Sequence, residues 1–78
     1  MDTMAFCARM AEALCMAPEM VSPSTPLSAD SWDSMAILAT MAVVDEMFGV
    51  VLPGERLSRC ARVQDIIDLV EEARSLAK

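Results

Sequence analysis

Apolar residues recur at helical spacing in three stretches of this chain. Residues 3–17 carry an apolar stripe with steps of three and four positions, made of Met4, Cys7, Met10, Ala11 and Leu14. From Ser34 to Phe48 a second stripe falls within about 60° of arc, made of Ile37, Met41, Val44 and Phe48. Residues 63–76 place a third stripe opposite charged side chains, made of Val63, Ile66, Ile67, Val70 and Ala73. The pattern predicts three helices that each turn one apolar face toward a common core.

Local signals predict where these helices begin and end. Pro18 stops the first helix or begins a turn after it. Asp33 suits the N-cap of the second helix, because its carboxylate can accept the unpaired amides of the first turn. Gly49 stands where a left-handed C-cap residue is expected. Residues 55–59 are long enough for one short helical turn before the last helix.

A long loop is predicted between the first and second helices. Residues 18–33 are rich in proline and small hydroxyl side chains, with Val21 and Leu27 as the expected anchors in the core. Loops of this length in a small domain are usually functional. Trp32, near the end of the loop, fits either a packed or an exposed position. The predicted fold is all-α: a single domain, residues 1–78, forming a small antiparallel bundle of three main helices plus a short helix between the second and last.

Composition excludes several classes of function. The chain has 12 acids, 6 bases and no histidine, so its net charge is −6, which disfavours nucleic acid or an anionic membrane as partner. No uncharged run approaches the about 20 residues that a transmembrane helix needs. Three cysteines without a Cys-x-x-Cys pair favour reduced thiols in a cytoplasmic protein and argue against a zinc site. The methionines at positions 4, 10 and 41 are interpreted as core residues.

The segment Asp33-Ser34-Met35 carries the chemistry of this chain. An acidic residue, a serine and a large apolar residue stand at the junction of the long loop and the second helix. The helix ends in Phe48-Gly49, an exit toward Pro53 follows, and the last helix opens with Val63-Gln64-Asp65-Ile66-Ile67. In this arrangement, which extends over almost the whole chain, the sequence resembles the acyl carrier proteins.

A second serine competes for the role of Ser34. Asp30-Ser31-Trp32 also reads as an acidic residue, a serine and a large apolar residue. The family keeps a nearly fixed distance from its serine to the exit of the second helix, and that distance fits Ser34 without a gap. Ser31 would require three inserted residues, so Ser34 is preferred and Ser31 stays the alternative.

The position of Ser34 also has a physical reason. The first amides of a helix point outward unpaired at the positive end of the helix dipole, which suits a phosphodiester. The chain has no histidine, and no lysine before Lys78, that could activate the serine, so Ser34 fits better as the substrate of a separate enzyme than as a nucleophile of its own. The resemblance implies that a phosphopantetheinyl transferase attaches 4′-phosphopantetheine to Ser34, and that Asp33 contacts this transferase. It implies a carrier rather than an enzyme, whose thiol holds acyl groups for acyl-loading, condensing or modifying enzymes.

The second helix is the main docking surface in the family and is often acidic there. Here Asp45 and Glu46 are the only acids between Ser34 and Gly49. The face opposite the apolar stripe is expected to be exposed and largely apolar, with Asp45 beside it; it comprises Met35, Ala39, Ala42, Val43 and Glu46. We therefore predict that partner binding depends less on salt than is usual for such carriers.

Two other functions remain open at this point. An unmodified helical domain could bind a partner through the same apolar face. A peptidyl or aminoacyl carrier is the nearest relative, although it usually has a glycine-rich approach to its serine, which is absent before Ser34. Fatty acid, polyketide and related pathways use closely similar carriers, so the acyl group stays unspecified. We expect a monomer.

Overall fold

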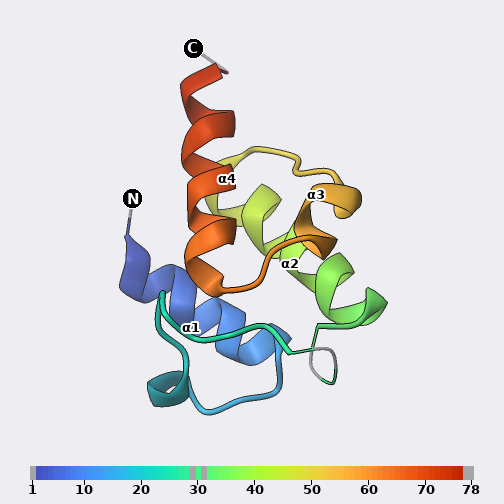
Figure 1. Ribbon diagram of the computed structural model, residues 1–78. Helices are drawn as coiled ribbons and strands as arrows, with labels where there is room; N and C mark the ends of the chain where they lie inside the picture. The colour runs from blue at the N-terminus through green and yellow to red at the C-terminus, as the bar shows by residue number, and fades with distance from the viewer. Residues whose placement is uncertain (1, 29, 31, 77–78) are drawn as a thin grey trace.

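Helices account for most of the described chain and surround one core (Figure 1). The computed structural model describes residues 2–28, 30 and 32–76. Their elements are α1 (Thr3–Ala13), the short 3-10 helix η1 (Pro18–Met20), α2 (Ser34–Phe48), α3 (Gly54–Ser58) and α4 (Val63–Leu76). The predicted all-α bundle, with three main helices, a short helix before the last and a long first loop, is confirmed. No helix in this part of the chain has the length and apolar character needed to cross a membrane.

The ends of α2 lie where the sequence predicts them. The N–H of Ala36 donates to Asp33 Oδ1 at 2.9 Å, so Asp33 is the N-cap. Gly49 has a φ of 68° and ends the helix in the left-handed conformation, where its N–H donates to the carbonyl of Asp45. Both ends of α2 are therefore set by residues whose local preferences could be predicted from the sequence.

The first helix is shorter than predicted, because a C-terminal motif without glycine ends it. Cys15 has a φ of 57°, which a non-glycine residue seldom adopts. The N–H of Met16 donates to the carbonyl of Ala11 at 2.8 Å, and that of Cys15 to the carbonyl of Glu12 at 3.2 Å. This pair of bonds is the Schellman arrangement, which satisfies the last carbonyls of α1 and turns the chain away at residue 14.

The apolar stripe of α1 is only partly as predicted. Cys7, Met10 and Ala11 are buried as expected, but Met4 is 85% exposed and is not a core residue. Phe6, which the stripe left out, is fully buried instead, and its ring centroid lies 5.8 Å from that of Phe48. The bulkiest side chain of the helix thus determines which face turns inward.

α2 is covered on two sides, so its buried surface is wider than the predicted stripe, whose four residues all pack in or against the core. Thr40 is fully buried on the side of α1, where its hydroxyl donates to the carbonyl of Ala36 at 2.8 Å and lies 3.6 Å from Met10 Sδ. On the side of α3, Ile37 and Met41 lie close to Gly54 and are half-buried. The most buried face shares Val44 with the predicted stripe but is centred to one side of it; it comprises Ala36, Thr40, Val43 and Val44.

The long first loop is attached to the start of α4. The N–H of Leu27 donates to the carbonyl of Ala61 at 2.8 Å, and that of Val63 donates to the carbonyl of Thr25 at 3.0 Å. Val21 is buried, and Leu27 packs against the core, as predicted for the two anchors. These contacts bring the end of the loop back toward α3 and α2.

Candidate attachment site

Ser34 is the first residue of α2, and its side chain is exposed. Asp33 caps the amide of Ala36, which leaves the N–H groups of Ser34 and Met35 without an acceptor inside the helix. The positive end of a 15-residue helix adds to the attraction for an anion. The hydroxyl is therefore open to another protein, and the donors beside it suit a phosphodiester.

Trp32, two residues before the serine, is buried. Its side chain is part of the core at 9% exposure, and the indole N–H donates to the carbonyl of Leu57 in α3 at 2.8 Å. This answers the question that the sequence left open, whether Trp32 is packed or exposed. The competing Ser31 lies outside the described residues, so the preference for Ser34 still rests on spacing.

The predicted docking face of α2 is exposed in part. Met35 is 74% exposed and Ala42 is exposed, while Ala39 is half-buried. Val43 is only 7% exposed, so its assignment to this face is wrong: it belongs to the side of α2 that packs in the core. Leu38, which is 59% exposed, was missed, although its spacing of three from Met35 and four from Ala42 is the helical signal for a shared face.

The charges on α2 lie at the end far from Ser34, and one of them is already paired. Arg9 of α1 donates two hydrogen bonds to the Glu46 carboxylate, at 2.9 and 3.3 Å. These bonds, together with the charge of Arg9, lower the pKa of Glu46, and the same contact raises the pKa of Arg9. Asp45 is exposed and makes no ion pair with any described residue. The exposed face of α2 near Ser34 is consequently apolar, with the exposed carboxylate of Asp45 at its far end.

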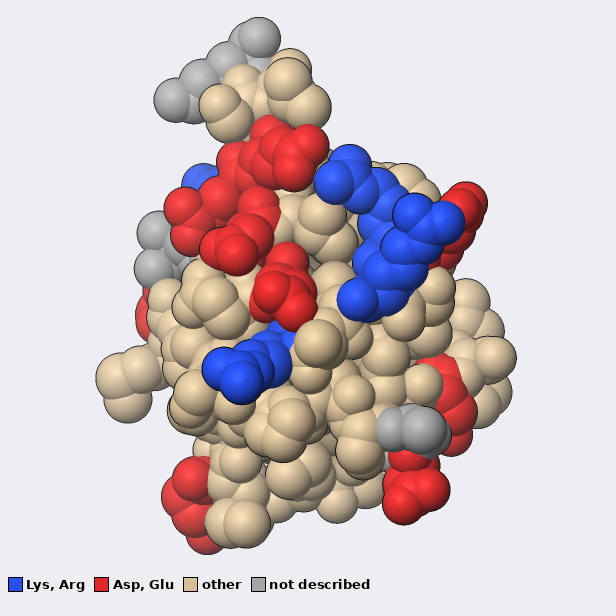
Figure 2. Space-filling model, in the orientation of Figure 1, with Lys and Arg blue, Asp and Glu red and all other residues tan. Residues whose placement is uncertain are grey.

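Most of the exposed charge lies over other helices. On the face drawn in Figure 2, acidic side chains gather over α4 and basic ones over α3. Arg56 lies 3.6 Å from Glu72, and Arg59 lies 2.9 Å from Glu55, so these bases neutralise neighbouring acids. Such exposed pairs contribute little to stability.

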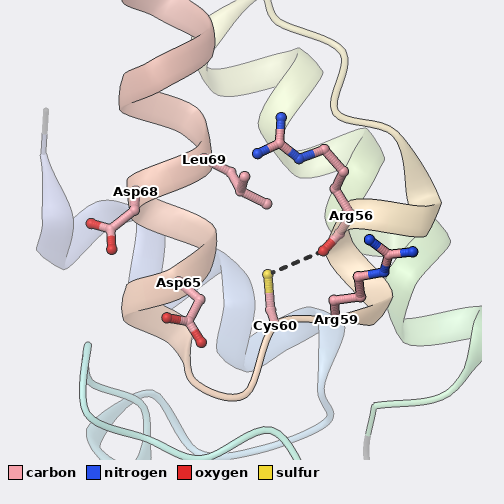
Figure 3. Close-up of a pocket in the computed structure, with 6 residues that line it drawn as sticks. All are labelled: Arg56, Arg59, Cys60, Asp65, Asp68 and Leu69. Atoms are coloured by element: carbon pink, nitrogen blue, oxygen red, sulfur yellow. Dashed lines mark hydrogen bonds between the residues drawn. The ribbon is translucent and has the colours of Figure 1, made fainter.

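A hollow of about 310 Å³ separates α3 from the start of α4 (Figure 3). It is lined by Arg56, Arg59, Cys60, Asp65, Asp68 and Leu69. Cys60 Sγ donates to the carbonyl of Arg56 at 3.6 Å, and burial, with the charge of Asp65 beside it, raises the pKa of this thiol to about 11. Such a thiol is a poor nucleophile. Among the residues that the structure describes, no three side chains of His, Cys, Asp or Glu are grouped to hold a metal ion.

Comparison with known families agrees with this geometry. Residues 5–70 match the family described as phosphopantetheine attachment site. No curated protein and no solved structure matches the chain. Domains of this family are carriers, generally without catalytic activity of their own, and they interact with a phosphopantetheinyl transferase and with partner enzymes. The matched residues include the whole of α2 and its N-cap, and the chain therefore belongs to the phosphopantetheine attachment site family, which carries covalently attached 4′-phosphopantetheine.

Proposed function

We propose that this protein is an acyl carrier protein and that Ser34 is the residue that bears 4′-phosphopantetheine. The observation that carries the proposal is the exposed hydroxyl of Ser34 at the first position of α2, within the region that matches the family. The bound group supplies a terminal thiol on a flexible arm, which holds acyl groups as thioesters.

The residues around Ser34 fit this role through binding and orientation rather than catalysis. The N–H groups of Ser34 and Met35, at the start of the helix, would suit a phosphodiester on the serine. Asp33 holds the helix start through its bond to Ala36. The sequence contains no histidine, its one lysine is Lys78, and the neighbouring Asp33 carboxylate accepts from Ala36, so the transferase is the proposed source of the base that takes the serine proton. The chain is thus a substrate of other enzymes.

The exposed apolar face of α2 is the proposed docking site for those enzymes. It consists of Met35, Leu38 and Ala42, with the half-buried Ala39 beside it and Asp45 at the far end. Exposed apolar surface beside a reactive group favours a partner site, and methionine adapts to several partners. The partners would be the phosphopantetheinyl transferase and the acyl-loading, condensing or modifying enzymes of fatty acid, polyketide or related biosynthesis. The net charge of −6 disfavours binding to nucleic acid or to an anionic membrane. The proposed carrier is a single domain over residues 1–78 that acts as a monomer in the cytoplasm.

The test is the intact mass of the protein after incubation with coenzyme A, Mg²⁺ and a promiscuous transferase. Wild type, Ser34→Ala and Ser31→Ala are treated together, with a known carrier as positive control. We expect a gain of one phosphopantetheine in wild type and in Ser31→Ala, and no gain in Ser34→Ala. A gain lost only in Ser31→Ala would move the attachment to Ser31. No gain in wild type beside an active control would favour an unmodified interaction domain.

A further inference from the structure

Trp32 connects the attachment site to a different helix. The indole N–H donates to the carbonyl of Leu57 at 2.8 Å, across 25 positions of sequence, and both side chains belong to the core. Leu57 is fully buried in α3, and its N–H donates to the carbonyl of Pro53. The residue two positions before Ser34 is therefore fixed to the last turn of α3.

α3 is in turn fixed to α2. A Cβ placed on Gly54 would lie 3.7 Å from Met41 Sδ and 3.8 Å from Ile37 Cγ2, which shows how closely the two helices approach. The segment before the serine is consequently held to α2 through two routes. Trp32 holds it through α3, and Asp33 holds it directly through the amide of Ala36.

The first loop reaches the same part of the chain. The N–H of Leu27 donates to the carbonyl of Ala61, three residues beyond the end of α3. Residues on both sides of the stretch that leads to the serine thus contact the chain between Leu57 and Ala61. Ser34 follows these held residues directly, so the backbone that bears its exposed side chain is anchored at the end of a long loop.

We propose that Trp32 is a positioning residue for the modification of Ser34. Its indole anchors the attachment segment, Trp32–Ser34, on α3, so that the serine is presented to the transferase already oriented. The inference rests on the proposed function. A substrate held in its bound arrangement loses less conformational freedom on binding, and apparent affinity falls when only a fraction of molecules has that arrangement. Removal of the anchor should therefore raise KM for the carrier and leave kcat nearly unchanged, because the bound transferase then orients the serine itself.

The experiment measures kcat and KM of the transferase for wild type, Trp32→Phe and Trp32→Ala. Phenylalanine keeps an aromatic ring in the core but has no N–H donor, while alanine removes the ring as well. Val70→Ala is the matched control, since it opens the core at a fully buried position of α4, outside the attachment segment and outside α3. All proteins are assayed well below their unfolding temperatures, and circular dichroism verifies that each is folded.

We expect KM to rise about threefold to fivefold in Trp32→Phe, the effect of one lost neutral hydrogen bond, and about tenfold or more in Trp32→Ala. Val70→Ala should keep the wild-type KM. An unchanged KM in folded Trp32→Phe, or an equal rise in Val70→Ala, would overturn the inference. If Trp32→Ala fails to fold, Trp32→Phe decides alone. A wild-type protein that gains no phosphopantetheine refutes the proposed function, whereas normal modification of every variant refutes only the role of Trp32.

Residue-specific replacement of the indole sharpens the test, because the chain has one tryptophan. Benzothienylalanine has nearly the shape of tryptophan but carries sulfur in place of the N–H. Incorporated at position 32, it removes the donor to Leu57 and leaves the packing in place. We expect it to raise KM as Trp32→Phe does, while a wild-type KM in this protein would mean that burial, and not the hydrogen bond, orients the serine.

Discussion

The clearest test of the site is a pair of substitutions at Asp33, where helix capping and the predicted contact with a transferase coincide. In Asp33→Ala the N–H of Ala36 loses the acceptor that it now has at 2.9 Å. Loss of an N-cap costs about 1 kcal/mol, within a range of roughly 0.5–2 kcal/mol. The carboxylate also interacts with the helix dipole, which is worth roughly 0.3–1 kcal/mol at an exposed position. We therefore expect Asp33→Ala to destabilise the protein by about 1–2 kcal/mol.

Asp33→Asn separates the two contributions. Asparagine keeps the shape and the acceptor oxygen, and it caps helices about as well as aspartate, but it carries no charge. Its cost should be only the interaction with the dipole, roughly 0.3–1 kcal/mol. In a domain of this size, 1 kcal/mol lowers Tm by about 4–8 °C, so the two variants are distinguishable. The assay is urea unfolding followed by circular dichroism, with transferase kinetics on the same samples.

Three outcomes would decide what Asp33 does. If Asp33→Ala is as stable as wild type, the capping argument from the Ala36 contact is wrong. If Asp33→Asn is modified normally while Asp33→Ala is impaired, Asp33 acts through the start of α2. If both variants are modified equally slowly, despite their different stabilities, the transferase contacts the carboxylate itself.

Four further predictions follow from the described contacts. Exposed Cys15 should be alkylated in the folded protein, whereas Cys60 should react only after unfolding, because burial raises the pKa of its thiol to about 11. Peptide mass mapping measures the alkylation of each cysteine, and equal labelling of the two in the folded protein would contradict this prediction. Leu38→Ala should change stability by less than about 0.5 kcal/mol yet weaken partner turnover, whereas Val43→Ala should cost roughly 1–3 kcal/mol in urea unfolding; equal stabilities would contradict the assignment of their faces. Partner turnover should fall less than about threefold between low and physiological ionic strength, and its abolition would make charge the main contribution to docking. Arg9 lowers the pKa of Glu46, so the Arg9–Glu46 ion pair should stabilise the fold at pH values above the ordinary glutamate pKa and lose that effect as the pH falls through the lowered pKa. Glu46→Gln should remove this part of the pH dependence of the free energy of unfolding, and an unchanged pH profile in the variant would refute the prediction.

The sequence predicted those parts of the fold that depend on local chemistry. The bounds of α2 follow from Asp33 and Gly49, each of which acts on its own helix end. The end of α1 was not predictable in this way, because Cys15 adopts the left-handed conformation without being glycine. No local preference of cysteine signals such a turn, which rests on the hydrogen bonds around it.

The faces of the helices depend on their neighbours and were harder to predict. A single apolar stripe describes α4 well, since that helix has one buried side and one charged side. α2 instead contacts α1 through Thr40 and α3 through Ile37 and Met41, so its apolar residues extend around more of the helix. A stripe drawn through the largest of them therefore missed the burial of Val43.

In the candidate site, too, some features depend on local sequence and others on residues far away in the chain. The position of Ser34 at an exposed helix start was predictable from the N-cap residue Asp33 before it and from the number of residues between Ser34 and the C-cap Gly49. The environment of Trp32 was not, since its partner lies 25 positions away in a helix of five residues. A helix of that length is not stable alone; it is held because Leu57 is buried in the core and the carbonyl of Leu57 accepts a hydrogen bond from Trp32. The hydrogen bond that supports α3 is therefore the same one that, by our proposal, orients Ser34 for modification.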